Sequence, residues 1–141
     1  MYSGTLAIPT QDAAGMQGQR SEHFGHSPYF TLVDLINDQV REVKTIANAE
    51  HGPGGCGAVV RLLQEQQADA VIAAGMGNGP LTKLVAAGIA VLFADHKRYP
   101  DVQSVVDDLR QLRQQPFARA HLCKGSGNCH QHGAVAKISI S

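Results

Sequence analysis

Two thiols and two imidazoles fall within ten residues near the end of the chain, in the stretch Cys-Lys-Gly-Ser-Gly-Asn-Cys-His-Gln-His. The candidate ligands are Cys123, Cys129, His130 and His132. Thiolate and imidazole are typical ligands of zinc, copper(I) and iron, and they suit magnesium or calcium poorly. The gap between the cysteines differs from zinc-finger spacing, so the pattern predicts a metal without specifying which. The alternative is a surface tail with incidental cysteines or a Cys123–Cys129 disulfide, although disulfides are uncommon in the cytosol.

A second group of candidate metal ligands lies in the first half of the chain. Cys56 and His51 share a glycine-rich segment before an expected helix, and a helix N-terminus biases a thiol toward thiolate. His23 and His26 flank Phe24-Gly25, and of these two histidines we prefer His23 as a ligand. We therefore predict a site at which Cys56 binds a metal together with His23 or His51. The alternatives are a small buried cysteine that helps the helix to pack and histidines with structural roles.

Two glycine-rich loops next to helices are candidate anion-binding sites. Free backbone N–H groups at a helix N-terminus form a natural pocket for anions. Neither loop has the Gly-Lys-Ser/Thr of a Walker loop or the glycine spacing of a dinucleotide fingerprint. The alternative is that the glycines only serve turns. The residues that we assign to cofactor binding are Gly55, Gly57, Gly75, Gly77, Asn78 and Gly79.

The sequence contains no constellation typical of an enzyme, so we expect no catalytic residues. It has neither a Gly-x-Ser-x-Gly elbow nor a His-Glu-x-x-His motif. Asp34 and Asp95 lie near expected strand ends, where a magnesium-dependent nuclease could place its carboxylates. Their spacing does not distinguish that role from ordinary solvated ends. His96 and His121 have no nearby partner and are expected at the surface.

The composition narrows the class of protein. A chain of 141 residues fits one domain with a sizeable core. Twelve Lys and Arg balance twelve Asp and Glu, so no net field favours nucleic acid or an anionic membrane. The sequence lacks a long apolar run and a secretory signal, and three cysteines are few for a disulfide scaffold. We expect a cytoplasmic protein that is a monomer or a weak homodimer.

Apolar patterns predict the elements that must position these residues. The expected strands are Thr5–Pro9, a hairpin of Tyr29–Ile36 and Val40–Ile46, and the buried strands Ala70–Ala74 and Ile89–Phe93. The expected helices are Ala58–Gln67, a short helix from Pro80 to Gly88, and Asp101–Gln115, which Pro116 ends. Asn48–Gly57 is expected to lack regular structure, and Val135–Ile140 to be an edge strand or a loose tail.

This order predicts an α/β fold with a mixed five-stranded sheet and the element sequence β-β-β-α-β-α-β-α. Residues 1–118 would form the domain, and residues 119–141 a C-terminal extension that contains Cys and His. The loop after Ala70–Ala74 follows the carboxyl end of a strand, where open α/β sheets usually bind ligands. We therefore expect the glycine loops around Cys56 and Asn78 to lie at the same edge of the sheet.

Four motifs resemble those of a known family when taken in order. They are Ser21-x-His23-Phe24-Gly25-x-x-x-x-Phe30, Gly55-Cys56-Gly57, Ala73-Ala74-Gly75-Met76-Gly77 and Ala87-Gly88-Ile89. Over about residues 3 to 115 the chain resembles the dinitrogenase iron–molybdenum cofactor biosynthesis family, which includes NifX, NifY and the C-terminal domain of NifB. The resemblance implies a ribonuclease-H-like three-layer fold and a non-catalytic role in nitrogen fixation, binding or carrying iron–sulfur or iron–molybdenum clusters. The implied partners are cofactor-assembly proteins or an acceptor metalloenzyme.

The chain departs from the family pattern at one place. Many relatives carry Gly-Pro-Arg or a similar sequence after the Gly-Met-Gly turn, whereas this chain has Gly77-Asn78-Gly79-Pro80. An arginine that could pair with an anionic cluster is therefore missing, so the ligand could differ.

The leading hypothesis is a carrier or scaffold for a metal cluster, and three alternatives stay open. The first is a zinc or copper(I) binding or sensing module that acts through the Cys/His tail. The second is a magnesium-dependent, ribonuclease-H-like nuclease that uses Asp34 and Asp95, which the neutral net charge disfavours. The third is a protein–protein adaptor.

Overall fold

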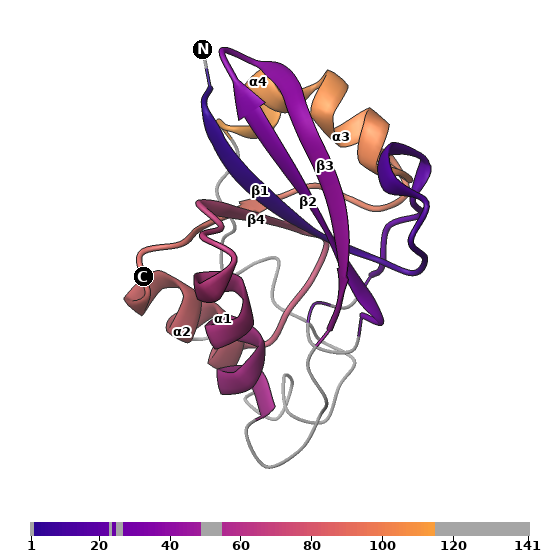
Figure 1. Ribbon diagram of the computed structural model, residues 1–141. Helices are drawn as coiled ribbons and strands as arrows, with labels where there is room; N and C mark the ends of the chain where they lie inside the picture. The colour runs from indigo at the N-terminus through magenta and orange to yellow at the C-terminus, as the bar shows by residue number, and fades with distance from the viewer. Residues whose placement is uncertain (1, 23, 25–26, 49–54, 115–141) are drawn as a thin grey trace.

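A computed structural model describes residues 2–22, 24, 27–48 and 55–114 (Figure 1). The strands are β1 (Gly4–Thr10), β2 (Tyr29–Ile36), β3 (Gln39–Ala47), β4 (Ala70–Ala73) and β5 (Ala90–Phe93). The helices are α1 (Gly55–Glu65), α2 (Asn78–Ala86), α3 (Val102–Asp107) and α4 (Leu109–Leu112), with a short 3₁₀ helix, η1, at Gly15–Gln17. The predicted order of elements is confirmed, except that the last helix is divided in two.

The strands form one mixed five-stranded sheet in the order β3-β2-β1-β4-β5, which confirms the predicted α/β class. β1 lies at the centre, antiparallel to β2 and parallel to β4, and β4 is parallel to β5. β2 and β3 form the predicted hairpin, whose turn residues Asn37 and Asp38 both have positive φ. Such a turn matches the twist of the two strands. The finer ribonuclease-H-like classification stays a prediction.

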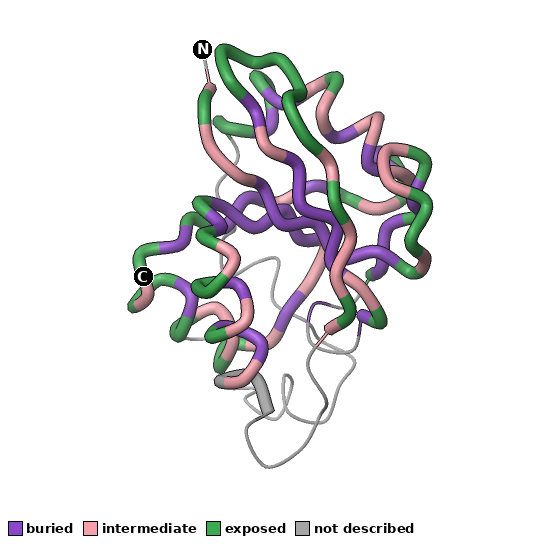
Figure 2. The backbone as a smooth tube through the Cα atoms, in the orientation of Figure 1, coloured by how far each residue is buried: buried purple, intermediate pink, exposed green. Residues whose placement is uncertain are grey.

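Helices cover both faces of the sheet, so the domain has three layers (Figures 1 and 2). On one face Ala7 and Val71 pack with residues of α1 and α2. On the other face Leu6 and Ile72 pack with residues of α3 and α4. All four residues of β4 are buried, as expected for a strand that is covered on both sides.

The predicted helix over residues 101–115 is divided at Asp108, whose φ of −115° and ψ of 24° leave the helical region. The carboxylate of Asp108 accepts a hydrogen bond of 2.5 Å from the hydroxyl of Tyr99. The helical spacing of buried residues continues on both sides of the break, since Val102, Val105 and Leu109 all lie in the core. The apolar pattern therefore predicted the packed face correctly and missed the break.

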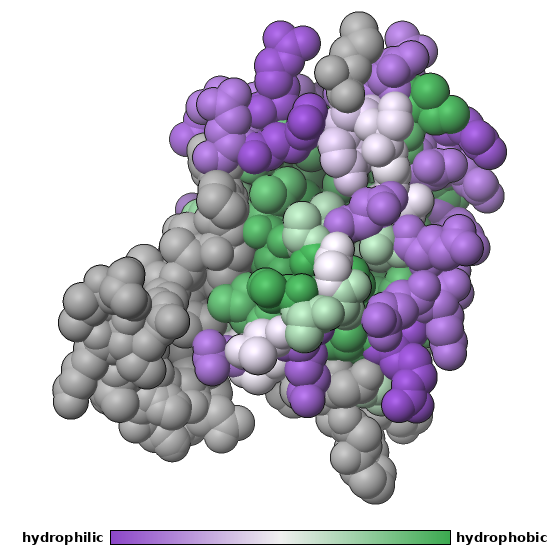
Figure 3. Space-filling model, turned by 90° about the vertical axis from the view of Figure 1, so that its left-hand side faces the viewer, coloured by the Kyte–Doolittle hydropathy of each residue, from purple (hydrophilic) through white to green (hydrophobic). Residues whose placement is uncertain are grey.

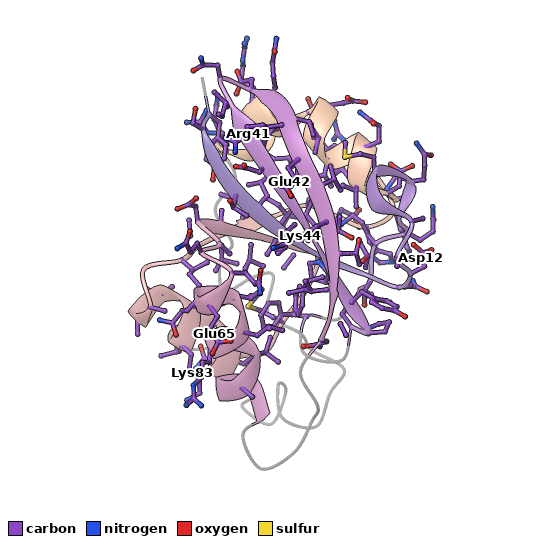
Figure 4. All side chains as sticks on the ribbon, in the orientation of Figure 1. Asp12, Arg41, Glu42, Lys44, Glu65 and Lys83 are labelled. Atoms are coloured by element: carbon purple, nitrogen blue, oxygen red, sulfur yellow. The ribbon has the colours of Figure 1, made fainter. Side chains whose placement is uncertain are left out.

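The outer strand of the hairpin is mostly exposed and carries charges. Arg41, Glu42 and Lys44 follow one another along β3 (Figure 4). Arg41 also pairs with Asp34 of β2, at 3.6 Å. Charged side chains on an edge strand discourage pairing with a further strand.

A different side of the molecule is less polar. There hydrophobic residues form an area bordered by hydrophilic ones (Figure 3). In the part of the chain that the structure describes, no helix has the length and apolar character needed to cross a membrane.

Candidate functional site

The N-termini of α1 and α2 lie at the carboxyl edge of the parallel strands. α2 follows β4 after a four-residue loop, and it therefore begins where β4 ends. α1 ends beside the start of β1, because Asp69, four residues after its last residue, donates its N–H to the carbonyl of Thr5. α1 thus runs antiparallel to the strands and begins at the opposite, carboxyl edge. The two helices also pack against each other.

The loop between β4 and α2, together with the start of α2, contains four of the six residues predicted to bind a cofactor. Gly77 is the N-cap of α2, with extended backbone (φ −79°, ψ 170°), and none of the described side chains caps the helix there. The backbone N–H groups at the start of a helix have no partner within the helix. Asn78 and Gly79, the first two residues of α2, are exposed, and Met76 anchors the loop in the core. The loop can therefore present backbone donors to an anion.

Cys56 lies in the first turn of α1, which begins at Gly55. The expectation that Gly55, Cys56 and Gly57 belong to an irregular loop is therefore wrong. Glycine has a low helix propensity, but a helix N-terminus tolerates it far better than a helix interior does. The side chains of α1 are described only from Ala58 onward, so the position of the Cys56 thiol lies outside the description.

All the other predicted metal ligands lie outside the described residues. These are His23, His51, Cys123, Cys129, His130 and His132. His26 and His121 lie outside them as well. The proposed metal-binding roles of all these residues stay predictions.

The segment before β2 runs across the same edge of the sheet. The carbonyl oxygen of Glu22 lies 3.6 Å from the position that a Cβ on Gly75 would take. Phe24 is 1% exposed, and its ring packs against Phe30 with centroids 5.4 Å apart. The aromatic residues of the Ser-x-His-Phe-Gly motif therefore hold this segment against the core beside the Gly75 loop.

A group of buried polar side chains lies where β1 ends and β2 begins, and sequence reasoning missed it. The hydroxyls of Thr10 and Thr31 are hydrogen-bonded at 3.0 Å, and the Ser27 hydroxyl donates to the Thr10 carbonyl at 2.9 Å. Arg20, whose backbone forms a β-bridge with Thr10, is also buried, with only 3% exposed. No sequence signal marks these residues, because an arginine in a loop-like stretch is ordinarily solvated.

His96 contacts two carboxylates, so the expectation that it has no partner is wrong. Its Nε2 lies 4.0 Å from Glu22 and its Nδ1 lies 3.8 Å from Asp95. The two carboxylates face opposite sides of the imidazole ring and therefore cannot share one ion with it. Among the residues described, no group of three or more His, Cys, Asp and Glu side chains is arranged to hold a metal ion.

The two carboxylates of the nuclease alternative lie at opposite ends of the sheet. Asp34 pairs with Thr5 at the start of β1, whereas Asp95 follows the end of β5. Measured along the strands, Asp34 and Asp95 are about six residues apart, which corresponds to roughly 20 Å. Because two-metal sites need their ions about 4 Å apart, these carboxylates cannot form one such site.

Solved structures share this fold. The apo form of the orange protein from Desulfovibrio gigas is 20% identical, with a TM-score of 0.68 over 83% of this chain and 94% of that protein. A Thermotoga protein provisionally described as NifB is 28% identical, with a TM-score of 0.57 over 78% of this chain and 90% of that protein. A protein from Methanocaldococcus jannaschii, provisionally described as a dinitrogenase, is 18% identical, with a TM-score of 0.60 over 79% and 91%. Curated protein sequences yielded no match.

The sequence also matches a family model. The model is described as dinitrogenase iron-molybdenum cofactor, and the match spans residues 5–112. The matched region contains the sheet, except for Gly4 at the start of β1, and all the helices that the structure describes. The chain therefore belongs to the dinitrogenase iron-molybdenum cofactor family.

Proposed function

We propose that this protein binds an iron–sulfur or iron–molybdenum cluster at the carboxyl edge of its sheet and carries it during metallocofactor assembly. Membership of its family ties the chain to the handling of the iron–molybdenum cofactor. One structural observation supports the location above all. The helices α1 and α2 both begin at this edge, and Cys56 lies in the first turn of α1.

The chemistry of this edge suits an anionic metal–sulfur cluster. A helix N-terminus stabilises thiolate, so Cys56 can bind iron or molybdenum directly. The exposed N–H groups of Asn78 and Gly79 can donate to bridging sulfides. His23 or His51 would complete the set of ligands, and the glycine neighbours leave room for a bulky inorganic group.

A carrier must release its cargo, and few protein ligands favour release. A rigid site with four ligands would hold a metal permanently. A site with one or two side-chain ligands and several backbone donors can transfer a cluster to another protein. The partners that we propose are cofactor-assembly proteins or an acceptor metalloenzyme, and we propose no catalytic role. The protein would act as a monomer or a weak homodimer with a ribonuclease-H-like fold.

The test compares two sets of cysteine variants after anaerobic reconstitution with ferrous iron and sulfide. Cys56→Ser replaces only the thiol, and we expect it to lower the iron and sulfide bound per chain about tenfold. The control is the double variant Cys123→Ser/Cys129→Ser, which removes two thiols that the proposed site does not use and should load normally. Metal and sulfide analysis gives the stoichiometry, and charge-transfer absorption bands report a cluster.

Other results would redirect the assignment. If Cys56→Ser loads normally and the double variant does not, the metal binds through the C-terminal Cys/His segment. One colourless zinc per chain, with no sulfide, would support the zinc-binding alternative and contradict the proposed cluster role.

A further inference from the structure

Arg20 is a buried arginine whose guanidinium is only partly paired. Its Nη1 donates to the carbonyl of Ala94 at 2.7 Å and to that of Tyr99 at 3.2 Å. The Nε and Nη2 atoms are also enclosed, and neither has a hydrogen-bond partner among the described residues. Buried polar groups are nearly always hydrogen-bonded, so an enclosed pair of free donors calls for an explanation.

The charge of Arg20 also lacks a contacting carboxylate among the described residues. Burial lowers the pKa of Arg20 to about 10, which leaves the guanidinium charged at neutral pH, and the negative charge of Asp95 partly offsets this effect. The carboxylate of Asp95 instead accepts the Lys97 N–H at 3.2 Å and lies 3.8 Å from His96. A buried charge without a direct partner is costly.

The two free atoms form one recognition unit. In a guanidinium, the Nε–H and one Nη2–H point the same way, side by side, as a fork for two acceptor atoms of one anion. Nη1 lies on the other side of the group and holds the Ala94 and Tyr99 carbonyls. Arg20 is therefore anchored through one nitrogen while its bidentate fork is unused.

Arg20 lies at the edge where the cluster is proposed to bind. Ala94, which accepts its shortest hydrogen bond, directly follows β5 and donates its own N–H to Ala73 at the end of β4. Two residues after Arg20, the backbone carbonyl of Glu22 lies next to Gly75. The guanidinium is thus fixed beside the carboxyl end of β5, at the same edge of the sheet as the loop that leads into α2.

We propose that the Nε/Nη2 fork of Arg20 binds two oxygen or sulfur atoms of a multiply charged anionic ligand, such as a metal–sulfur cluster or an oxometalate. This inference deepens the proposed function and rests on it. Arg20 then provides the positive charge that the Gly77-Asn78-Gly79 turn lacks. The ligand recognised at this edge carries at least two negative charges and presents two acceptor atoms together.

The experiment uses the full-length chain with molybdate as the probe, followed by calorimetric titration at low ionic strength. Arg20→Gln keeps an amide donor for the Ala94 carbonyl but removes the charge, and we expect its molybdate affinity to fall at least tenfold. Arg20→Lys keeps the charge but lacks the fork. Its affinity for molybdate should lie between those of Arg20→Gln and the wild type. The matched control is Arg98→Gln, which removes an exposed charge four residues after Ala94 and should change the affinity less than twofold.

The same variants are reconstituted with ferrous iron and sulfide, so that the two proposals can fail separately. If Arg20→Gln and Arg20→Lys both fold and bind molybdate as tightly as the wild type, the role of Arg20 is overturned. Arg20-dependent binding of molybdate by a wild-type chain that loads no cluster supports the anion site and contradicts the cluster-carrying function. Circular dichroism verifies folding, and Arg20→Lys decides the matter if Arg20→Gln does not fold.

Discussion

Phe24 connects a histidine-bearing motif to the hydrophobic core. Its ring is buried and tilted by 60° against that of Phe30, an arrangement typical of favourable aromatic pairs. Phe24, which belongs to one of the motifs that resemble the family, thus has a packing role of its own. It holds the Arg20–Glu22 segment beside the Gly75 loop, and any role of the neighbouring histidine depends on that anchoring.

We expect Phe24→Ala to lower the free energy of unfolding by about 3–5 kcal/mol, because it opens a cavity in the core. Urea denaturation followed by circular dichroism measures this change, with Phe24→Leu as the control that keeps most of the volume and costs less. If Phe24→Ala unfolds at the same urea concentration as the wild type, the ring does not contribute to the core.

Individual residues were predictable where their roles follow from local pattern. The buried aliphatic residues of β4 are an example, since a short apolar run predicts a strand covered on both faces. The side-chain hydrogen bonds of Arg20 and the contact of His96 with Glu22 were not predictable, because these partners are distant in sequence. Arg20 contacts the carbonyl of Ala94, 74 residues later, and His96 contacts Glu22 of the segment that precedes β2.

At the scale of elements, the start of α2 is the best-described part of the candidate site. Its N-cap, Gly77, makes no side-chain capping bond within the described residues, and Asn78 and Gly79 are exposed. A helix that was selected only for stability would gain from Ser, Asn or Asp at this cap. An uncapped N-terminus is consistent with donors reserved for a ligand.

The variant Asn78→Asp separates stability from binding at this N-terminus. A negative charge there interacts favourably with the helix dipole, so we expect the free energy of unfolding to rise by about 0.5 kcal/mol. The same charge repels an anionic cluster, so iron and sulfide loading should fall several-fold. Thermal denaturation and metal analysis measure the two effects.

Gln64→Glu is the matched control, since it adds the same charge on an exposed position near the other end of α1. It should leave cluster loading unchanged. Equal loading of Asn78→Asp and the wild type would show that the N-terminus of α2 does not face the cluster.

Most elements were predicted close to their observed bounds, and the errors have local causes. The hairpin and β4 came within one residue at each end. α1 begins earlier than expected because Gly55 and Gly57 occupy its first turn. The last helix breaks at Asp108, where the hydrogen bond from Tyr99 depends on a tertiary contact that periodicity does not reveal.

At the scale of the whole molecule, the described helices and strands end at Leu112. About 80% of this chain aligns with each of the solved structures. The aligned part covers 90% or more of each of those proteins. The family match also ends at residue 112. Residues 119–141 lie beyond this match, and their assignment as a C-terminal extension of the domain stays a prediction.

We expect a chain truncated after residue 118 to fold with a melting temperature within a few degrees of the full-length value. It should also load iron and sulfide through Cys56. Differential scanning calorimetry and metal analysis test both expectations. A truncated chain that folds normally but binds no metal would place the ligands in the removed segment.

The central position of β1 has a consequence for synthesis of the protein. β1 comes first in the chain, yet Leu6 pairs with Ala70, 64 residues later. While the nascent polypeptide leaves the ribosome, the β2–β3 hairpin can cover one edge of β1, but the other edge waits for β4. An open strand edge of this kind is prone to pair with other chains, so early translation is the stage at which chaperones would protect this protein most.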